Sequence, residues 1–493
     1  MQRNRLGCAA AAWLALAPAS VAAQATPVAV RAGLILPIVG PEIRNGVLLV
    51  EGGKIVAVGP ADRVKIPAGA EIVDATGKVV MPGLIDSHSH IADAEWADKA
   101  SPIQGDVRIL DAINPFADNI KRARAGGITT VNILPGSGHL MSGQSAYLKL
   151  RDATRVEDML VCTDLLQQIC GGMKMANGTN SRGEPPFPGS RAKSAALVRE
   201  KFVKAIEYRN ALRAAGTDST KRPPRDLELE AIVQVLDGKR VVHFHTHRAD
   251  DIMTVLRLQK EFGFRVVLHH VSDAWKVAKE IAAAGVPVSL IVIDSPGGKQ
   301  EAIDWHPENG AALERAGVLV GFHTDDWITD SRFFMREAAM SVRAGMSRKK
   351  ALEGLTIANA KILGLEDRIG SLEPGKDADF IVLTGDPLSV YTHVEQTWID
   401  GKKLFDLRDP IQRNYATGGY GYSRDDRAEI DEDGDDAAGS QWSPGCGTGP
   451  RAARHWDSSR CWRRRRRRAR RSPCGGRRCT PWPGPRSGTA SCW

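Results

Sequence analysis

Two histidines one residue apart, His88 and His90, end an apolar run over residues 79–85. Side chains alternate along an extended strand, so both imidazoles project from the same face, with Asp86 beside them. Imidazole nitrogen is a common ligand of zinc and related ions, and two on one face form half of a metal site. Pairs with this spacing also occur by chance on surface loops, so the rest of the chain has to decide between the two interpretations.

Three later apolar segments also end in residues that bind metals. They are His243, His245 and His247 in residues 241–247, His269 and His270 in residues 264–270, and His323 with Asp325 in residues 318–325. Side-chain alternation places the three histidines of the first segment on one face of the strand. In the second segment it allows only one of the two adjacent histidines to point to the same side as the other candidate ligands. In the last segment it puts the histidine and the aspartate on the same face.

A lysine occupies the middle of another apolar segment, because Lys174 lies between Met173 and Met175. If both methionines pack outward against helices, the lysine faces the interior. A buried ammonium among other cationic groups is strongly disfavoured. Conversion to a carbamate would give an anion that two metals can share.

Strand patterns alternate with helical patterns through the middle of the chain, which is typical of βα units around a parallel sheet. The expected strands include residues 127–133, 241–247, 264–270, 286–293 and 318–324, with helical segments at 252–262, 278–284 and 311–316. At least six such units favour a (β/α)8 TIM-type barrel over an open sheet. Active-site groups of such barrels come from the C-terminal ends of several strands. Any one candidate alone would be explained as a hydrogen-bonded core side chain, but convergence from five strand ends predicts a metal site.

Short β-type segments with tight turns fill residues 27–80 and return in residues 377–402. Neither piece has enough apolar strands to bury a core alone. We therefore expect one small β-sandwich domain built from both ends of the chain, over residues 24–80 and 369–415, around a barrel over residues 81–368.

The charge of the chain is unevenly distributed. Of the net +9 in 493 residues, residues 451–493 contribute +13 through 14 arginines and one acidic residue, which leaves −4 for residues 1–450. A mildly acidic body gives no reason to expect a nucleic-acid partner. The tail composition cannot bury a core, so residues 416–493 are predicted to be disordered or read out of frame. A basic tail that binds nucleic acid or an anionic membrane is the alternative.

Residues 1–23 have the pattern of a secretory signal peptide: Arg3 and Arg5, an apolar stretch over residues 8–18, and small residues up to Ala23. The apolar stretch is too short to form a stable membrane anchor. We expect export across the inner membrane to a bacterial periplasm. Between the leader and the tail only Cys162 and Cys170 remain, so no disulfide framework supports the fold.

Taken together, these motifs resemble the metal-dependent amidohydrolase superfamily, and most of all its imidazolonepropionase-like and prolidase-like branch. The motifs are residues 80–90, 245–251, 323–326 and 370–379, and the similarity extends from about residue 27 to residue 406. The combination is specific to the superfamily and much less specific to a substrate.

The resemblance implies a ligand set and roles for individual residues. His88 and His90 would bind the more buried metal, His245 and His270 the other, and Asp325 would complete the site and act as acid/base. Lys174 matches the position where binuclear members carry a carboxylated lysine that bridges both ions, whereas some members hold one metal without it. Candidate substrate-binding residues are His139, His247, Arg248 and His323.

These ligands suit zinc or a similar divalent ion, one or two per chain, which lowers the pKa of bound water to about 7 and so supplies hydroxide. We predict hydrolysis of a C–N bond in an amide, a dipeptide or a cyclic amide, with a small molecule as substrate. A deaminase of the same superfamily and a binding protein with a vestigial metal site are the alternatives. The sequence is compatible with a homo-oligomer.

Overall fold

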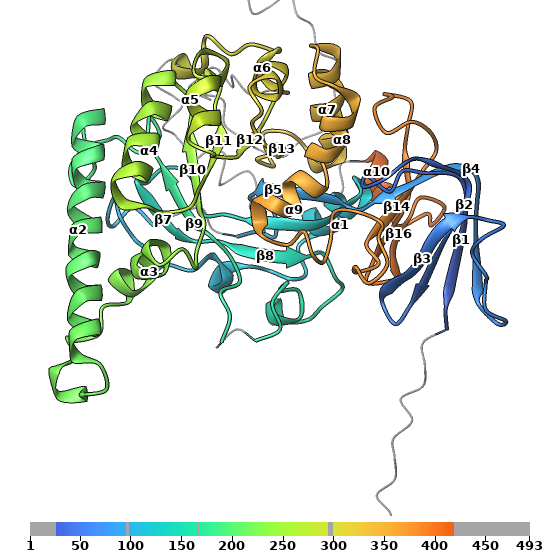
Figure 1. The fold of residues 1–493 in the computed structure, drawn as a ribbon, viewed down its shortest axis with the longest axis horizontal. Helices are drawn as coiled ribbons and strands as arrows, with labels where there is room; N and C mark the ends of the chain where they lie inside the picture. Colours follow the sequence, from blue (N-terminus) through green and yellow to red (C-terminus); the bar gives the residue numbers. More distant parts are fainter. Residues whose placement is uncertain (1–25, 95–97, 165–166, 294–298, 419–493) are drawn as a thin grey trace, which may run out of the picture. The chain divides into compact units, whose positions relative to one another are not determined.

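The computed structural model describes residues 26–94, 98–164, 167–293 and 299–418 (Figure 1). The predicted signal peptide and residues 419–493 of the predicted tail lie outside the described residues. Within these ranges, no helix is both long enough and apolar enough to cross a membrane. The predicted domain limits stay predictions.

Strands from both ends of the chain pair in one seven-stranded sheet, in the order β16-β15-β14-β4-β1-β2-β3 (Figure 1). Its strands are β1 (Val28–Ile35), β2 (Ile43–Glu51), β3 (Lys54–Pro60), β4 (Glu71–Pro82), β14 (Phe380–Leu383), β15 (Val394–Ile399) and β16 (Lys402–Asp406). The two ends meet where β14 runs antiparallel to β4, with Phe380 opposite Pro82. Leu48, Val80 and Trp398 belong to an apolar core of this sheet. The two-layer sandwich form stays a prediction.

The remaining strands form a six-stranded sheet, β13-β12-β11-β10-β9-β7, and a three-stranded sheet, β5-β6-β8. They are β5 (Leu84–Ser89), β6 (Ile128–Ile133), β7 (Met141–Gln144), β8 (Ala146–Lys149), β9 (Met173–Ala176), β10 (Val242–Thr246), β11 (Val266–His270), β12 (Val288–Leu290) and β13 (Val320–Phe322). Neighbours from β9 to β13 run parallel, as do β5 and β6. The chain therefore has the mixed α/β content and parallel strands that the alternating pattern predicts.

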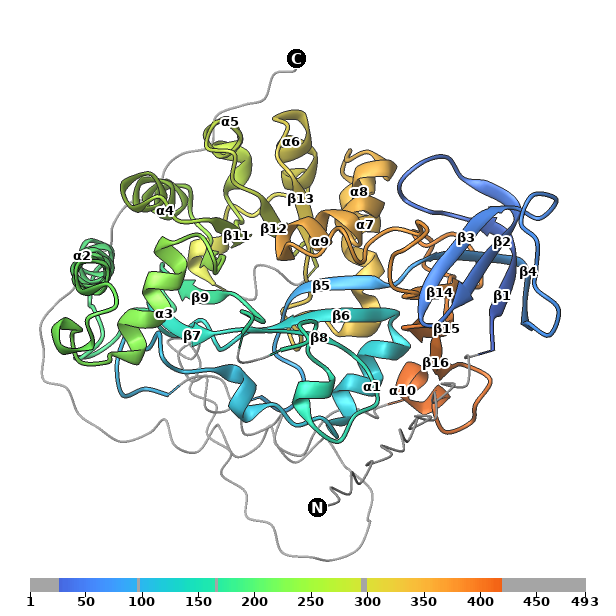
Figure 2. The ribbon, with the colours of Figure 1, turned by 60° about the horizontal axis from the view of Figure 1, so that its bottom comes forward.

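Helices follow most of the parallel strands. They are α1 (Asp118–Ala125), α2 (Arg191–Ala215), α3 (Leu227–Leu236), α4 (Ala249–Phe262), α5 (Ala278–Ala283), α6 (Asn309–Arg315), α7 (Phe334–Arg343), α8 (Arg348–Gly354), α9 (Ile357–Leu363) and α10 (Arg413–Thr417). Figure 2 shows α4, α5 and α6 in a row outside β11, β12 and β13. α4 buries Ile252 and Val255 and ends at Gly263, whose φ of 74° is a conformation that glycine adopts without strain.

Two strands are shorter than the apolar pattern predicts, since β12 and β13 have three residues each. After β12, the backbone N–H groups of Val292 and Ile293 donate to the Glu337 carboxylate. After β13, the backbone N–H of Asp325 donates to the carbonyl oxygen of His88 at 2.9 Å. Hydrogen bonds outside the strand ladder thus end both strands early, and the second of them brings β13 beside β5.

A buried lysine joins β8 to the seven-stranded sheet. The Nζ atom of Lys149 lies 2.7 Å from Asp377 Oδ2 and 3.0 Å from Asp379 Oδ2, and it also contacts the carboxylate of Asp400. The side chain is fully buried. Cys162 and Cys170, in the loop after β8, form a disulfide.

Candidate metal centre

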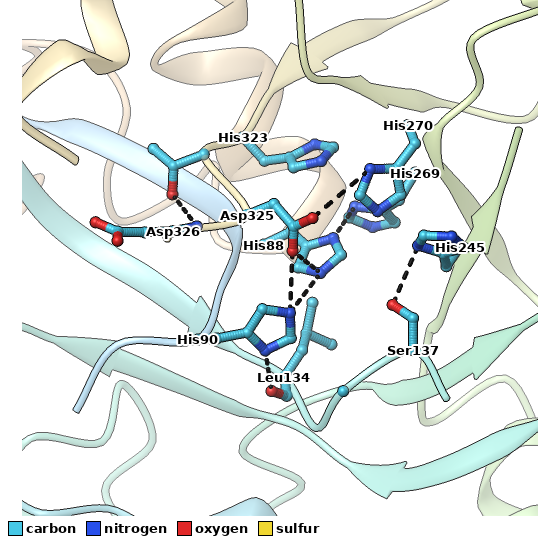
Figure 3. Close-up of polar contacts among 12 residues, drawn as sticks. His88, His90, Leu134, Ser137, His245, His269, His270, His323, Asp325 and Asp326 are labelled. Carbon is cyan, nitrogen blue, oxygen red and sulfur yellow. Dashed lines mark hydrogen bonds and ion pairs between the residues drawn. The ribbon is translucent and has the colours of Figure 1, made fainter. Parts of the chain in front are cut away.

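His88 and His90 are both buried, and their Nε2 atoms lie 3.3 Å apart (Figure 3). Asp325 Oδ1 lies 3.2 Å from the Nε2 of His88 and 3.0 Å from that of His90. The Nδ1 atom of His90 is 2.8 Å from the Leu134 carbonyl oxygen. Because a carbonyl oxygen only accepts, Nδ1 carries the hydrogen and Nε2 keeps its lone pair. The three side chains form one of the groups that could hold a metal ion.

β9 brings Lys174 to the same point. Its Nζ atom lies 2.9 Å from His88 Nε2, and the side chain is fully buried. Both flanking methionines belong to the apolar core, as alternation predicts. Burial lowers the pKa of Lys174 to about 7, and Asp325 only partly opposes this effect. An amine that loses its proton near neutral pH can react with CO2, so the geometry is consistent with the predicted carbamate.

A second group of donors lies on the other side of the aspartate. The rings of His245 and His270 have centroids 4.1 Å apart, and His270 Nδ1 is 4.0 Å from Asp325 Oδ2 (Figure 3). The donor atoms of His245, His247 and His270 all lie within 4.8 Å of one another. The carboxylate of Asp325 therefore lies between two histidine groups.

The expectation that only one of the two adjacent histidines faces inward is wrong. His269 Nδ1 lies 3.3 Å from His88 Nδ1, while His270 faces Asp325 (Figure 3). The reason is local, because the backbone of His270 has a φ of 69° and so leaves the extended conformation on which alternation depends. His269 contacts the Nδ1 edge of His88, opposite the Nε2 atom that faces Lys174. This placement favours His270 over His269 as a ligand.

Buried nitrogen atoms test whether these residues suit a metal. Among the described residues, no hydrogen-bond partner is found for the Nε2 atoms of His245, His247, His270 and His323. An unsatisfied buried polar group costs about 1–3 kcal/mol. A cation among these lone pairs would offset that cost, and imidazole with carboxylate is a donor set that zinc accepts. The residues therefore fit a divalent metal.

Electrostatics favour the protonation states that bind a metal. Burial, reinforced by Lys174, lowers the pKa of His88 well below its ordinary value. Burial likewise lowers the pKa of His247 and of His323 to about 3. Burial alone would raise the pKa of Asp325, but His88 and the other neighbouring histidines lower this pKa well below its ordinary value. At neutral pH the imidazoles of His88, His247 and His323 are therefore neutral and the Asp325 carboxylate is ionised, which are the states that bind a metal.

The predicted substrate-binding residues occupy different environments. His323 lies at the centre: its ring stacks on His88 with centroids 4.8 Å apart, and its Nδ1 is 2.8 Å from Ser289 Oγ. His139 is buried, with its ring 5.1 Å from that of Phe187. Two histidines, His247 and His323, thus reach the donor groups.

Arg248 lies farther out, in a cavity of about 630 Å³ formed by the loops after β9, β10, β11 and β12. Its guanidinium donates two hydrogen bonds, each 3.0 Å long, to the Asp250 carboxylate. Arg182 lines the same cavity, half-buried, and its Nε donates to the Gly178 carbonyl oxygen at 3.1 Å. Among the described residues, no carboxylate lies within 4.0 Å of the Arg182 guanidinium.

Sequence patterns did not predict the side chains that orient the second histidine group. Ser137 Oγ lies 3.1 Å from His245 Nδ1 (Figure 3), and Ser272 Oγ lies 2.8 Å from His247 Nδ1. Both serines are in loops, where periodicity carries no information. The Gly/Pro-rich loop over residues 135–138 was the only signal for Ser137.

Comparison with known proteins shows the family of the chain. The amidohydrolase family model matches residues 79–404. The crystal structure of an amidohydrolase from Thermotoga maritima MSB8 is 35% identical, with a TM-score of 0.70, and the match covers 77% of this chain and 100% of that one. The chain belongs to the amidohydrolase family and is a hydrolase that acts on C–N bonds.

Curated relatives define its branch. Amidohydrolase tasK from Hapsidospora irregularis is 29% identical, and the match covers 74% of this chain but only 40% of that protein's length. An imidazolonepropionase from Fusobacterium nucleatum is 22% identical, with 73% of this chain and 92% of that protein covered. A 5-methylthioadenosine/S-adenosylhomocysteine deaminase from Symbiobacterium thermophilum is 26% identical, with 72% and 84% covered. The matches to curated imidazolonepropionases confirm the resemblance to that branch. A solved prolidase-like structure from Bifidobacterium longum, 20% identical with a TM-score of 0.50, has a similar fold.

Proposed function

We propose that this enzyme hydrolyses an amide, dipeptide or cyclic amide bond in a metal-dependent reaction, with Asp325 as acid/base. The observation that carries the proposal is the position of the Asp325 carboxylate. One oxygen lies 3.0–3.2 Å from the Nε2 atoms of His88 and His90, and the other faces His270. A group in that place would contact both a reactive water and the bond to be cleaved.

The chain's own residues would hold one or two divalent ions, with zinc as the ion that best suits them. His88, His90 and Asp325 would bind the first, and His245 and His270 the second. Lys174, converted to a carbamate, would bridge them. A bound ion of this kind lowers the pKa of water and polarises a carbonyl group.

The ionised Asp325 carboxylate would accept a proton from the attacking water and deliver it to the departing nitrogen. His247 and His323 each hold Nδ1 near a serine hydroxyl, so their Nε2 atoms are available to a substrate. For a substrate carboxylate, Arg182 is better placed than Arg248, whose guanidinium is already occupied by Asp250.

We further infer that the six-stranded and three-stranded sheets form the wall of one barrel. The support is their contact at β5 and β13. The Asn359 amide donates to the carbonyl oxygens of Ile85 and Phe322 at 2.5 and 2.6 Å, and so links the two strands. A closed wall would place all the proposed ligands around one opening.

The test combines metal analysis with a substrate screen. Purified protein, as isolated and after zinc reconstitution, is assayed against dipeptides, N-acyl amino acids and cyclic amides, with free ammonia measured separately. Assayed at a zinc concentration that keeps the site loaded, Asp325→Asn should lose about 10²–10⁴-fold in kcat, the usual contribution of a general acid/base. Asp62→Asn, at an exposed position, is the matched control and should behave as wild type.

Near-full activity of Asp325→Asn with zinc still bound would contradict the proposed role. Zinc-dependent ammonia release from an amino-substituted ring, without cleavage of any amide, would favour a deaminase. The match to a deaminase of 5-methylthioadenosine/S-adenosylhomocysteine is the observation that keeps this second candidate in the screen.

A further inference from the structure

Three buried polar side chains that the proposed reaction does not use form a row behind His88. His269 Nδ1 lies 3.3 Å from His88 Nδ1, and His269 Nε2 lies 2.9 Å from His243 Nδ1. His243 Nε2 in turn lies 2.8 Å from the hydroxyl oxygen of Tyr147. His243 and His269 are 0% and 1% exposed, so no water competes for these contacts.

The row is placed to act on His88 and not to bind a metal itself. It meets the Nδ1 edge of the His88 ring, whereas Lys174 and Asp325 lie at Nε2. Both ring nitrogens of His243 and of His269 already face a polar partner within the row. Although donor atoms of His88, His269 and His323 also lie within 4.8 Å of one another, a metal bound by His269 would have to break one of these contacts.

The row can hold its hydrogens in two arrangements. Each nitrogen–nitrogen contact needs one N–H and one lone pair, and a neutral imidazole has one of each. If His88 Nδ1 donates to His269, then His269 Nε2 donates to His243 and His243 Nε2 donates to Tyr147. In this arrangement His88 Nε2 carries only a lone pair. In the reverse arrangement His88 Nε2 carries the hydrogen and cannot accept a metal.

Gly172 leaves space for the imidazole ring of His243. A Cβ atom at this position would lie 2.3 Å from Cδ2 and 2.7 Å from Nε2 of His243. A glycine immediately before β9 thus allows His243 to lie against the backbone with both nitrogens directed at partners. Simple space filling would not require this close approach.

We propose that Tyr147, His243 and His269 are positioning residues that hold His88 in the tautomer whose Nε2 accepts the metal, and that they thereby set the metal affinity of the site. This inference rests on the proposed role of His88 as a ligand. The row acts through His88 and touches neither the substrate nor the reacting atoms. Outer partners of metal-bound histidines typically change affinity by about 10–100-fold when they are removed.

The experiment compares two substitutions, at one position, whose side chains have the same branching and the same number of non-hydrogen atoms. In His269→Asn the amide oxygen can accept from His88 Nδ1–H, whereas in His269→Leu no atom can. The zinc dissociation constant of each full-length protein is measured by competition with a chromophoric chelator, with the melting temperature of the zinc-free protein as a check of folding. We expect about 10–100-fold weaker binding for His269→Leu and affinity near that of wild type for His269→Asn.

Tyr147→Phe provides a second variant that removes only the hydroxyl at the far end of the row. It should weaken zinc binding in the same direction, by less than His269→Leu. Equal weakening in His269→Asn and His269→Leu would overturn the inference, because it would show that the row only fills space. Unchanged affinity in both His269→Leu and Tyr147→Phe would overturn it as well.

His88→Ala separates this inference from the proposed function. Loss of zinc in His88→Ala together with unchanged zinc binding in His269→Leu would refute the positioning role of the row. The assignment of His88 as a metal ligand would still hold. Zinc binding that survives His88→Ala unchanged would refute the ligand assignment and the row with it. The visible spectrum of the cobalt-substituted protein gives an independent readout, since its intensity depends on ligand geometry and should change in His269→Leu but not in His269→Asn.

Discussion

Replacing Lys149 by methionine tests whether the buried ion cluster connects the seven-stranded sheet to the strands that support the metal site. Lys149 ends β8, which pairs with β6, and β6 pairs with β5, the strand of His88. Its Nζ atom is the cation shared by Asp377, Asp379 and Asp400. Methionine has a similar length and no charge, so the substitution removes the ammonium with little change in volume.

The expected cost follows from burial and from the number of partners. Removing one member of a buried ion pair typically destabilises a protein by about 3–5 kcal/mol, because the other charge stays buried without a partner. Here Lys149 is 0% exposed, and the side chains of Asp377 and Asp379 are each 3% exposed. Of the three carboxylates, only Asp379 would lose its one cation, because Asp377 also pairs with Lys54 and Arg368 and Asp400 also pairs with Arg151. We therefore expect a loss near the lower end of that range at pH 7. Protonation of Asp379 should reduce the loss as the pH falls.

Urea unfolding of the zinc-loaded protein measures this effect at pH 7 and pH 5. Lys204→Met is the control, because Lys204 forms an exposed pair with Glu200, its side chain being 54% exposed, and solvent screens such a pair so that it contributes little to stability. A loss below about 1 kcal/mol in Lys149→Met, or one no larger than in the control, would refute the reasoning from burial. A loss that grows toward pH 5 would refute the assignment to the unpaired Asp379 carboxylate.

Two further predictions concern acid stability and export. Burial alone would raise the pKa of Asp377, but Lys149 and the other cationic neighbours lower this pKa from 3.8 to about 2. The ionised carboxylate therefore stabilises the fold above pH 4, and this stabilisation is lost as the pH falls toward 2. Asp377→Asn should therefore lack about 2 kcal/mol at pH 7 and show a flatter acid-unfolding curve than wild type, and parallel curves would contradict this assignment. We also propose export to an oxidising compartment, on the basis of residues 1–23 and of the Cys162–Cys170 disulfide. Intact-mass analysis should find a mature protein that begins after Ala23, and a mature mass that includes Met1 would refute export with cleavage.

Alternation predicted the faces of the site residues wherever the backbone stays extended. His88 and His90 share a face because residues up to Ser89 belong to β5. The same rule failed at His269 and His270, where one left-handed residue turns a second imidazole inward. A histidine at positive φ has no signature in the pattern of apolar residues, so this part of the site had to come from the structure.

Contacts between side chains from distant segments also could not be predicted from the sequence. The Ser272 hydroxyl reaches His247 from the loop after the next strand, and the row behind His88 joins side chains from β5, β8, β10 and β11. Periodicity gives the direction of each side chain along its own strand. It does not give the offset between neighbouring strands, which decides whether two nitrogens lie 3 Å or 6 Å apart.

Lys149 and Lys174, both fully buried, show that neighbouring charged groups determine the protonation state of a buried lysine. Both Lys149 and Lys174 lie in short apolar strands, but only Lys174 was singled out from the sequence, on the argument that a buried ammonium needs compensation. Although burial alone would lower it, three carboxylates raise the pKa of Lys149, so that lysine stays charged and structural. Lys174 faces histidines and a single nearby carboxylate, and burial lowers its pKa to about 7. Only Lys174 therefore offers a neutral amine for carboxylation at physiological pH. Nearby carboxylates thus make Lys149 a structural ion-pair partner, and their scarcity makes Lys174 a candidate metal bridge. The pattern of each strand could not show this difference, because Asp379, one of the carboxylates that contact Lys149, lies 230 positions away along the chain.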